Sequence, residues 1–380
     1  MLKIFKSVHL ILLFLTIFTV LVNHIYSHPA WGIIVDSRKQ IYFTDLVTVW
    51  KIDSEGKLSI FRTAVKDRHV HDLSIDAGDN IYGLDNSYDP ETQKFFRGIW
   101  KASAKGEFSE IVPLTENIPT GISIWRDFQG NTYLVEPYNN ERRESKIIKR
   151  TVNGKTSLFA GGNYGYLDGR KEKAKFGNIL DMAFAEDGSI YLTDSNRVRK
   201  IDKFGAVKTL YPTDNSYPNS SQLFGLTVDK QNNVFVADFG GSRLIKIDSV
   251  GKNSTVLTSD KDWSPLGVAT FGNEIFVLEG KTYMSKSQGN RVLRISSDNQ
   301  KAVIADLEDA NKTINLPESE KQNFQLKTQE NNNFNSDSSL KTEKQTIRTE
   351  NERLGLYSIV GAIIVAFTAF VFFRKNKFIG

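Results

Sequence analysis

Residues 181–201 read Asp-Met-Ala-Phe-Ala-Glu-Asp-Gly-Ser-Ile-Tyr-Leu-Thr-Asp-Ser-Asn-Arg-Val-Arg-Lys-Ile, and this stretch decides the fold. A short apolar strand (181–185) leads into a tight turn with Gly188, a residue that tolerates positive φ. An aromatic strand follows and ends in Asp194, and the next strand carries Lys200 near its end. A second turn, with Gly205, precedes a fourth strand (207–211). The stretch therefore predicts an antiparallel unit of four strands.

The same pattern occurs six times along the chain. Every second strand ends in a carboxylate, and the six copies are IYFTD (41–45), IYGLD (81–85), TYLVE (132–136), IYLTD (190–194), VFVAD (234–238) and IFVLE (275–279). Every third strand carries a basic residue in one register, at Lys51, Lys101, Lys149, Lys200, Lys246 and Arg294. Repeats of roughly 40–60 residues with four strands each are typical of a β-propeller. The sequence predicts an all-β, six-bladed β-propeller over residues 28–306.

Two structural details follow from the repeats. An acid that ends a strand commonly accepts hydrogen bonds from the backbone N–H groups of the next turn, so we expect the repeated carboxylates to be structural. Blade 1 begins with its own inner strand, and blade 6 supplies its own outer strand. We therefore expect the ring to close by side-chain packing rather than by a shared strand.

The composition argues against two classes of function. The chain has no cysteine, so it has neither a disulfide nor a thiolate metal site. The end segments 1–27 and 374–380 hold five basic residues and no acid, which equals the net charge of +5. The chain between them is electrically balanced and gives no support for nucleic-acid binding.

The amino-terminal segment, 1–27, has the order of a secretory signal peptide. Lys3 and Lys6 precede an apolar run (8–22), and a short polar stretch follows. Cleavage is expected before His28, after Ile25 and Ser27 at the −3 and −1 positions. The alternative is an uncleaved signal anchor, because the site lacks the usual alanine pair.

The carboxyl-terminal segment predicts a membrane anchor. Residues 354–373 carry no charge and are long enough to span a bilayer as a helix. The basic residues in 374–380 follow at once, which predicts a short cytoplasmic tail. Residues 307–353 are rich in Asn, Gln, Ser, Lys and Glu and predict a disordered linker. We expect a single-pass protein of the cell membrane whose propeller lies on the extracytoplasmic side.

Long loops are predicted on one face of the propeller. With the strands of a blade lettered A to D from the inside outward, the extended B–C loops are 86–98, 137–145 and 280–290, and the longest D–A loop is 160–178. These two loop types share a face, whereas the A–B and C–D turns of the other face are short. Binding residues concentrate in loops on a rigid scaffold, so we expect an unknown protein partner or small-molecule ligand on the loop-rich face.

One motif carries a family resemblance. Residues 159–169 read FAGGNYGYLDG and are followed by Ala174-Lys-Phe176 and by the strand that ends in Asp194. This resembles the NHL repeat, whose pattern is A-G-x-x-x-G-x-x-D-G, then A-x-F, then an aromatic-led strand ending in Asp. The match is strongest in blade 4, good in blade 5 and diluted elsewhere. The resemblance implies an NHL-type propeller, in a superfamily shared with gluconolactonase-like and strictosidine-synthase-like propellers.

The same resemblance implies where an enzyme of that superfamily would hold its metal. Lactonase-like members bind a divalent metal at the channel mouth through Glu, Asn and Asp at the starts of the inner strands. Here that register is mainly apolar and makes a poor calcium site: Trp31, His71, Thr120, Leu180, Phe224 and Leu266. Virginiamycin-lyase-like propellers need a histidine pair late in the chain, and no histidine follows His71.

A polar cluster at the start of the inner strands marks the candidate site. His69 and His71 share one side of a strand, and two such imidazoles can chelate a transition metal with carboxylates completing the shell. Asp72 and Asp181 occupy a register that otherwise holds Gly in most blades. We expect ligand binding at the channel mouth on the loop-rich face, by His69, His71, Asp72, Thr120, Glu136 and Asp181. A divalent metal, if bound, is expected on His69, His71 and Asp72.

Two classes of function follow from these observations. The favoured one is a membrane-tethered, exported propeller that acts as a binding or interaction module through its loop-rich face. The alternative is a metal-dependent, lactonase-like hydrolase that uses the His/Asp cluster. A spacer without a ligand is disfavoured, because a spacer would not need one face of long loops.

Overall fold

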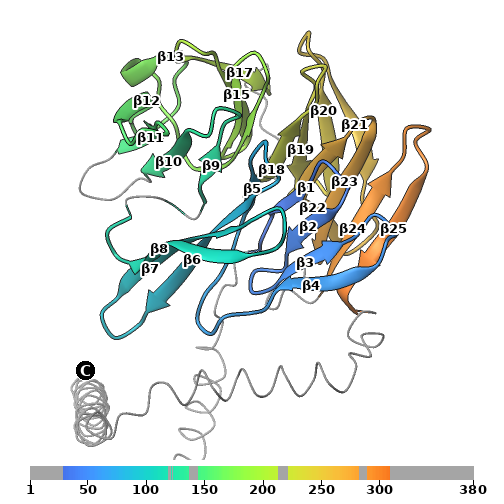
Figure 1. Ribbon diagram of the computed structural model, residues 1–380. Helices are drawn as coiled ribbons and strands as arrows, with labels where there is room; N and C mark the ends of the chain where they lie inside the picture. Colours follow the sequence, from blue (N-terminus) through green and yellow to red (C-terminus); the bar gives the residue numbers. More distant parts are fainter. Residues whose placement is uncertain are drawn as a thin grey trace, which may run out of the picture. The chain divides into compact units, whose positions relative to one another are not determined.

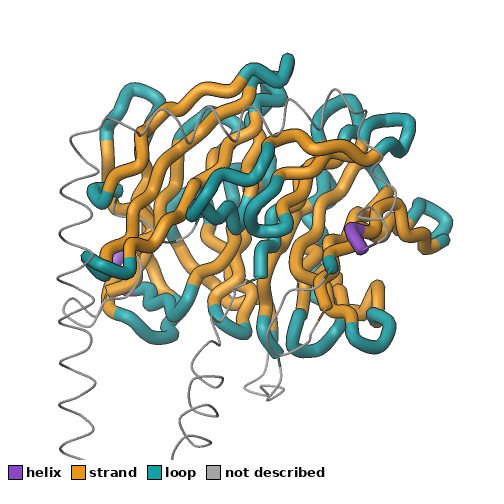
Figure 2. Tube along the Cα trace, turned by 90° about the horizontal axis from the view of Figure 1, so that it is seen from below, coloured by secondary structure: helices purple, strands orange, loops and turns teal. Residues whose placement is uncertain are grey.

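The computed structural model describes residues 29–118, 121, 123–136, 144–212, 221–281 and 289–308. Their strands form six antiparallel sheets. The innermost strands lie together at the centre of the ring, as β1, β5, β18 and β22 show in Figure 1. In Figure 2 the strands cross the body, and loops and turns gather at their ends. The predicted all-β, six-bladed propeller is confirmed.

Each blade is built from consecutive strands, in order from the inside outward. Blade 1 is β1 (Ile33–Val35), β2 (Ile41–Thr44), β3 (Val49–Ile52) and β4 (Leu58–Arg62); blade 2 is β5 (Leu73–Ile75), β6 (Ile81–Asp89), β7 (Lys94–Ala102) and β8 (Phe108–Thr115). Blade 3 is β9 (Trp125–Arg126), β10 (Thr132–Glu136), β11 (Glu144–Arg150) and β12 (Thr156–Asn163); blade 4 is β14 (Ile179–Phe184), β15 (Ile190–Asp194), β16 (Arg197–Ile201) and β17 (Ala206–Tyr211). Blade 5 is β18 (Leu223–Val228), β19 (Val234–Asp238), β20 (Arg243–Ile247) and β21 (Asn253–Thr258); blade 6 is β22 (Trp263–Phe271), β23 (Glu274–Lys281), β24 (Asn290–Ile295) and β25 (Lys301–Asp306).

The ring closes without an exchanged strand, as expected from the repeats. Strand β1 of blade 1 packs directly on β22 of blade 6. Gly267 allows this approach, because a Cβ at that position would lie 1.9 Å from the carbonyl oxygen of Trp31. Across the same seam, Lys39 Nζ lies 2.5 Å from Glu274 Oε2. Packing and one ion pair therefore join the first blade to the last.

The hydrophobic core lies between neighbouring blades rather than within each sheet. Between blades 1 and 2, for example, Tyr42 and Val49 of the first blade pack with Leu73, Ile81 and Trp100 of the second. Burying a large apolar side chain contributes roughly 1.5–3 kcal/mol. The alternation of apolar residues in the repeats thus holds the blades to one another.

The repeated basic residue of the third strands covers an aromatic ring of the second strand. Lys149 lies directly opposite Tyr133, with its Nζ 5.2 Å from the ring centroid. The corresponding pairs, at 5.1–5.7 Å, are Lys51–Tyr42, Lys101–Tyr82, Lys200–Tyr191 and Lys246–Phe235. In blade 6, Arg294 faces Phe276 and forms an ion pair with Glu274. Cation–π contacts and shielding of the ring by the lysine stem explain the conserved spacing within the chain.

The strand-ending acids have structural partners in several blades, although the partners differ from the expected turn amides. Asp45 follows the expectation, since its Oδ1 accepts from the N–H groups of Val47 (3.1 Å) and Thr48 (2.8 Å). Four other acids bind arginine: Asp85–Arg62 (2.8 Å), Asp194–Arg199 (2.6 Å), Asp238–Arg243 (2.9 Å) and Glu279–Arg291 (2.7 Å). A desolvated carboxylate gains more from a charged donor than from an amide.

The predicted B–C loop 86–98 of blade 2 is wrong, because most of it continues the strands. Strand β6 extends to Asp89 and β7 begins at Lys94, so only a four-residue turn, 90–93, remains. The rings of Tyr88 and Phe95 face each other across this hairpin at 4.8 Å. Cross-strand aromatic pairs stabilise β-structure, which overrides the polar character of the segment.

The NHL-like segment of blade 4 is also more ordered than a loop. After β12, residues Gly169–Arg170 form β13, which pairs with β17 and adds a fifth strand, and a 3-10 helix (Lys171–Lys173) follows. Arg199 is completely buried beneath this segment. Its Nη2 donates to Asp168 Oδ1 (2.9 Å) and to the Leu167 carbonyl (3.0 Å). The motif therefore anchors its own loop to the sheet.

The predicted membrane signals fall outside the structure's described ranges. The signal segment 1–27, residues 309–353 of the linker, the span 354–373 and the tail 374–380 all belong to this remainder. Among the residues that the structure does describe, no helix is long and apolar enough to cross a membrane. These assignments stay predictions from the sequence.

Candidate functional site

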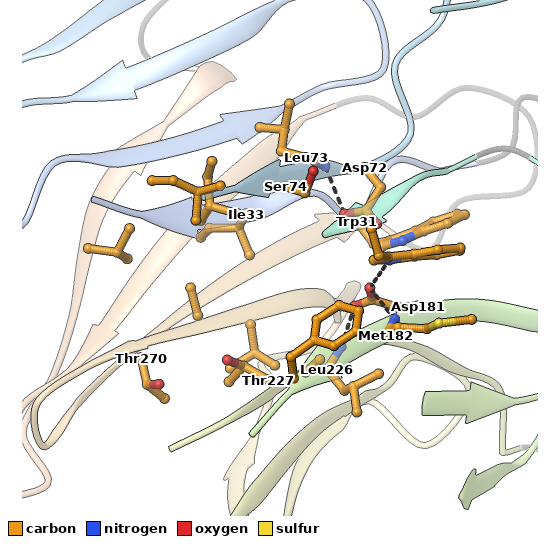
Figure 3. A pocket seen from close by; sticks show the side chains of 18 of the residues that line it. Trp31, Ile33, Asp72, Leu73, Ser74, Asp181, Met182, Leu226, Thr227 and Thr270 are labelled. Atoms are coloured by element: carbon orange, nitrogen blue, oxygen red, sulfur yellow. Dashed lines mark hydrogen bonds between the residues drawn. The ribbon is translucent and has the colours of Figure 1, made fainter. Parts of the chain in front are cut away.

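The inner strands of all six blades enclose a cavity of about 200 Å³. Its wall combines polar atoms, which make up the larger share, with apolar side chains such as Ile33, Leu73, Met182, Leu226 and Val268. Two acids also line it, Asp72 from blade 2 and Asp181 from blade 4. Figure 3 shows both acids and Trp31 at one end of the cavity, with Thr227 and Thr270 at the other.

The acid end of the cavity is the more tightly packed one. In blades 1, 2, 5 and 6 the inner strands begin at the loop-rich face with buried residues, among them Trp31 and His71. Gly225 keeps the backbones close, because a Cβ there would lie 2.8 Å from Gly267 Cα. At the opposite end of the strands, cavity residues such as Thr270 are only half-buried. Among the described lining residues, the half-buried ones such as Thr270 thus lie nearer the short A–B turns than the two acids do.

Asp181 is fully engaged by hydrogen bonds from three blades. Its Oδ1 accepts from the Met182 N–H (2.7 Å) and from Trp125 Nε1 of blade 3 (2.9 Å). Its Oδ2 accepts from the Leu226 N–H of blade 5 (2.7 Å). Burial raises the pKa of Asp181 to about 6, and these three donors oppose a larger rise. Asp181 therefore links neighbouring blades in addition to lining the cavity.

Asp72 has the same local geometry but fewer partners. Its Oδ1 accepts from the N–H of the next residue, Leu73 (2.8 Å). Its Oδ2 is buried and makes no hydrogen bond of normal geometry, although Asp181 and Trp125 are close enough to influence its ionisation. Burial first, and then the charge of Asp181, raise the pKa of Asp72 well above its usual range. Both shifts favour the protonated form, so the pair holds its last proton to a higher pH than exposed carboxyl groups would.

The structure unites only part of the predicted site. Asp72 and Asp181 line one cavity, as their shared register suggested. His69 is exposed, and its ring centroid lies 6.4 Å from that of His71, which packs on Trp31 at 5.8 Å. His69, His71 and the half-buried Glu136 are not among the cavity-lining residues. Thr120 lies outside the described residues.

The metal hypothesis gains no third ligand from the geometry. In the described part of the chain, no group of three or more His, Asp or Glu side chains is arranged to hold a metal ion. Asp72 points into the cavity, whereas the two imidazoles do not line it. Metal binding by His69, His71 and Asp72 stays a prediction.

Trp125 and Arg126 were missed as site residues. Trp125 faces Tyr133 across the sheet, in a register held elsewhere by residues such as Ser74, Ala183 and Thr227. When the six repeats are aligned, Trp125 stands at a position where the other blades have smaller residues, and this difference could have identified it. The guanidinium of Arg126 lies 4.5 Å from the Tyr82 ring and donates to the Gly130 carbonyl (2.9 Å).

Comparisons with known proteins relate this chain to others by fold alone. No protein-family model matches it, and no curated protein matches its sequence. Similar solved structures include virginiamycin B lyase from Staphylococcus aureus, with 16% identity over 72% of this chain and 83% of that chain and a TM-score of 0.46. A gluconolactonase from Xanthomonas campestris has 13% identity over 66% and 84%, with a TM-score of 0.47. A calcium-binding regucalcin from Agrobacterium tumefaciens has 13% identity over 67% and 82%, with a TM-score of 0.46.

Proposed function

We propose that this chain is a binding protein whose propeller takes a small ligand into its central channel. The observation that carries the proposal is the cavity of about 200 Å³, bordered at one end by Asp72 and Asp181. Concave sites in which a few polar groups converge beside apolar side chains are the usual places for small ligands. Its volume lies below the roughly 300–1,000 Å³ of sites for drug-sized molecules, which favours a smaller ligand.

The proposal includes the membrane arrangement expected from the sequence. The segments 1–27, 354–373 and 374–380 support an exported propeller on a single carboxyl-terminal span. The loop-rich face stays a proposed surface for a protein partner. The NHL-type classification is supported by the motif at 159–169, whose Asp168 meets the buried Arg199.

Protease treatment of intact cells, or of spheroplasts where an outer membrane is present, tests this arrangement. Cleavage in residues 307–353 should release the propeller, because that predicted linker would be outside the cell. Complete protection, after access has been verified with a known exposed protein, would contradict the proposed topology.

The alternative function is a metal-dependent hydrolase. The similar solved structures include a gluconolactonase and a calcium-binding protein. These activities belong to those proteins, because a likeness at this level concerns the fold alone. For this chain the alternative is supported by the closely spaced imidazoles of His69 and His71. It requires further ligands from segments beyond the described ones, such as 119–120 or 137–143.

Two measurements on the purified chain separate these functions. Elemental analysis and calorimetry with Zn²⁺ and Ca²⁺ should detect a stoichiometric metal only if the hydrolase proposal is right. Ligand-observed NMR with small aromatic alcohols and amines should detect binding that Thr270→Phe abolishes, because the ring fills the half-buried end of the cavity. Thr255→Phe, on the exposed outer strand β21, is the matched control and should bind normally. Equal binding by the two variants would place the ligand elsewhere and overturn the channel proposal.

A further inference from the structure

The acid end of the cavity lacks a fixed positive charge. No ion pair among the described residues involves Asp72 or Asp181, whereas the buried acids Asp85, Asp194 and Glu279 all have arginine partners. Asp181 is satisfied by neutral donors alone, and Asp72 Oδ2 makes no regular hydrogen bond although the residue is only 8% exposed. Leaving a buried polar atom unpaired costs about 1–3 kcal/mol, which a bound donor would recover.

We propose that Asp72 and Asp181 bind a small organic cation, a primary ammonium group carried on a short apolar body. This inference rests on the proposed channel-binding function and names the ligand class. The ammonium supplies three N–H donors and one positive charge to a pair that has a free acceptor and a net negative charge. The apolar wall formed by Leu73, Met182 and Val268 would receive the rest of the molecule.

Other ligand classes fit this end of the cavity less well. A divalent cation such as Ca²⁺ takes six to eight oxygen ligands, and the described residues place no third acid or histidine with these two carboxyl groups to hold a metal. An anion would meet the negative charge of the pair. The size limit is also informative, because a dry cavity of about 150 Å³ in another protein accepts benzene. A volume of about 200 Å³ therefore suits one aromatic ring or a short alkyl chain with an aminomethyl group.

Few other charges act on the bound group. Of the residues lining the cavity, Arg126 on β9 is the one charged side chain besides the two acids, and the lining parts of β1, β18 and β22 carry none. Arg126 is held away from the acids by the Gly130 carbonyl, by Thr132 Oγ1 (3.2 Å) and by the Tyr82 ring. The ring of His71, next to Asp72, packs on Trp31.

Burial favours the form of the pair that holds one proton, and binding of the cation displaces that proton. If the ligand arrives as an ammonium ion, Asp72 releases its proton to solvent and becomes a carboxylate. If a neutral amine arrives, the O–H bond of Asp72 breaks and the proton forms an N–H bond on the amine. Both routes give one ammonium and two carboxylates. Affinity for the cation therefore rises with pH until the amine itself deprotonates.

Calorimetry of the full-length chain in an uncharged detergent, with micelle blanks, tests the inference with three probes of similar size. Benzylamine should bind at least about tenfold more tightly than benzyl alcohol, and benzoate should bind more weakly than either. The affinity for benzylamine should increase between about pH 5 and about pH 8, whereas that for benzyl alcohol should change little. In two buffers of different ionisation enthalpy, benzylammonium binding should release a proton.

Matched variants locate the effect. Asp72→Asn should reduce the affinity for benzylamine by about tenfold or more while leaving benzyl alcohol binding intact, which also shows that the cavity is folded. Glu186→Gln removes an exposed acid from the A–B turn of blade 4 and should change neither affinity. Unchanged benzylamine binding in Asp72→Asn overturns the inference. So does equal affinity of the wild-type chain for benzylamine and benzyl alcohol, although channel binding itself would then stand. If none of the three probes binds, both the cation inference and its channel site are contradicted.

Discussion

Asp194 and Asp181 lie on adjacent strands of blade 4, and both are buried, yet their surroundings differ. Asp194 meets the guanidinium of Arg199 at 2.6 Å, and the same arginine reaches Asp168. Asp181 meets an indole N–H and two backbone amides, and its acidic neighbour is Asp72. The first site is neutralised by the protein's own arginine, whereas at the second burial raises the pKa of both acids.

The contrast indicates which buried charge serves the fold and which remains open to a ligand. Arg199 fixes the NHL-like segment to β16 and pairs with both Asp194 and Asp168. Asp72 and Asp181 instead border open space with an acceptor unused. Buried charges without a fixed counter-ion are costly, and such groups are enriched at functional sites.

The largest effect is expected at the neutralised site. Replacing Arg199 by leucine should lower the free energy of unfolding by about 3–5 kcal/mol, because Asp194 would remain buried without its cation. Urea unfolding of the chain measures this loss. Lys94→Leu is the control, since the side chains of Lys94 and its partner Glu116 are 54% and 45% exposed and the loss should be at most about 1 kcal/mol. Equal losses would remove the distinction between a buried network and a surface pair.

The acids at the cavity should make the stability of the chain depend on pH. The folded-state pKa of Asp181 is raised from 3.8 to about 6, so the unfolded chain releases this proton first as pH rises. Stability is therefore lost between about pH 4 and about pH 6, by about 3 kcal/mol from this group. The difference in unfolding free energy between wild type and Asp181→Asn, followed across this range, isolates the contribution from other acids. A pH-independent difference would show that Asp181 is not desolvated.

A smaller effect should separate two buried tryptophans. Trp125→Phe removes the N–H that Asp181 accepts, whereas Trp100 Nε1 is buried without a hydrogen-bond partner. Both substitutions lose similar packing, so Trp125→Phe should cost about 1.5–3 kcal/mol more than Trp100→Phe. Thermal and urea unfolding of the two variants check this difference. A larger loss at Trp100 would contradict the assigned role of the indole.

The smallest effect is expected where a charge meets only an aromatic ring. Lys246→Met keeps most of the apolar stem over Phe235 but removes the cation, so it should cost about 0.5–1 kcal/mol. Lys230→Met, at an exposed turn position of the same blade, should be nearly neutral. If the two variants unfold identically, the repeated basic residues do not stabilise the blades and serve only solubility.

Much of the fold could be predicted from the sequence, because the strands of each repeat are determined by residues within that repeat. The second strands and the tight turns were placed correctly, since β-branched and aromatic residues and Gly act through short-range preferences. The role of the third-strand lysines could not be inferred from the sequence, because it depends on the strand register that places each lysine opposite an aromatic ring of the second strand. The hairpin of blade 2 was missed because its polar residues resemble a loop, while one pair, Tyr88 and Phe95, stabilises the strands.

The candidate site was predictable only in part. The repeat register singled out Asp72 and Asp181, and these two residues do meet in one cavity. Alternation along a strand placed His69 and His71 on one side but could not show that they lie outside that cavity. The close approach of the backbones of blades 5 and 6 at Gly225 and Gly267 could not be inferred from a single repeat. That property arises only when the ring is closed.

Each blade is one contiguous segment of the chain, and this bears on circular permutation. Since no strand is shared between blades 1 and 6, the covalent break in the ring coincides with an ordinary boundary between blades. A circular permutant that joins the end of β25 to the start of β1 and opens the chain between β12 and β14 would keep every sheet pairing except β13 with β17. The order of the blades in the gene is therefore separable from their order around the ring.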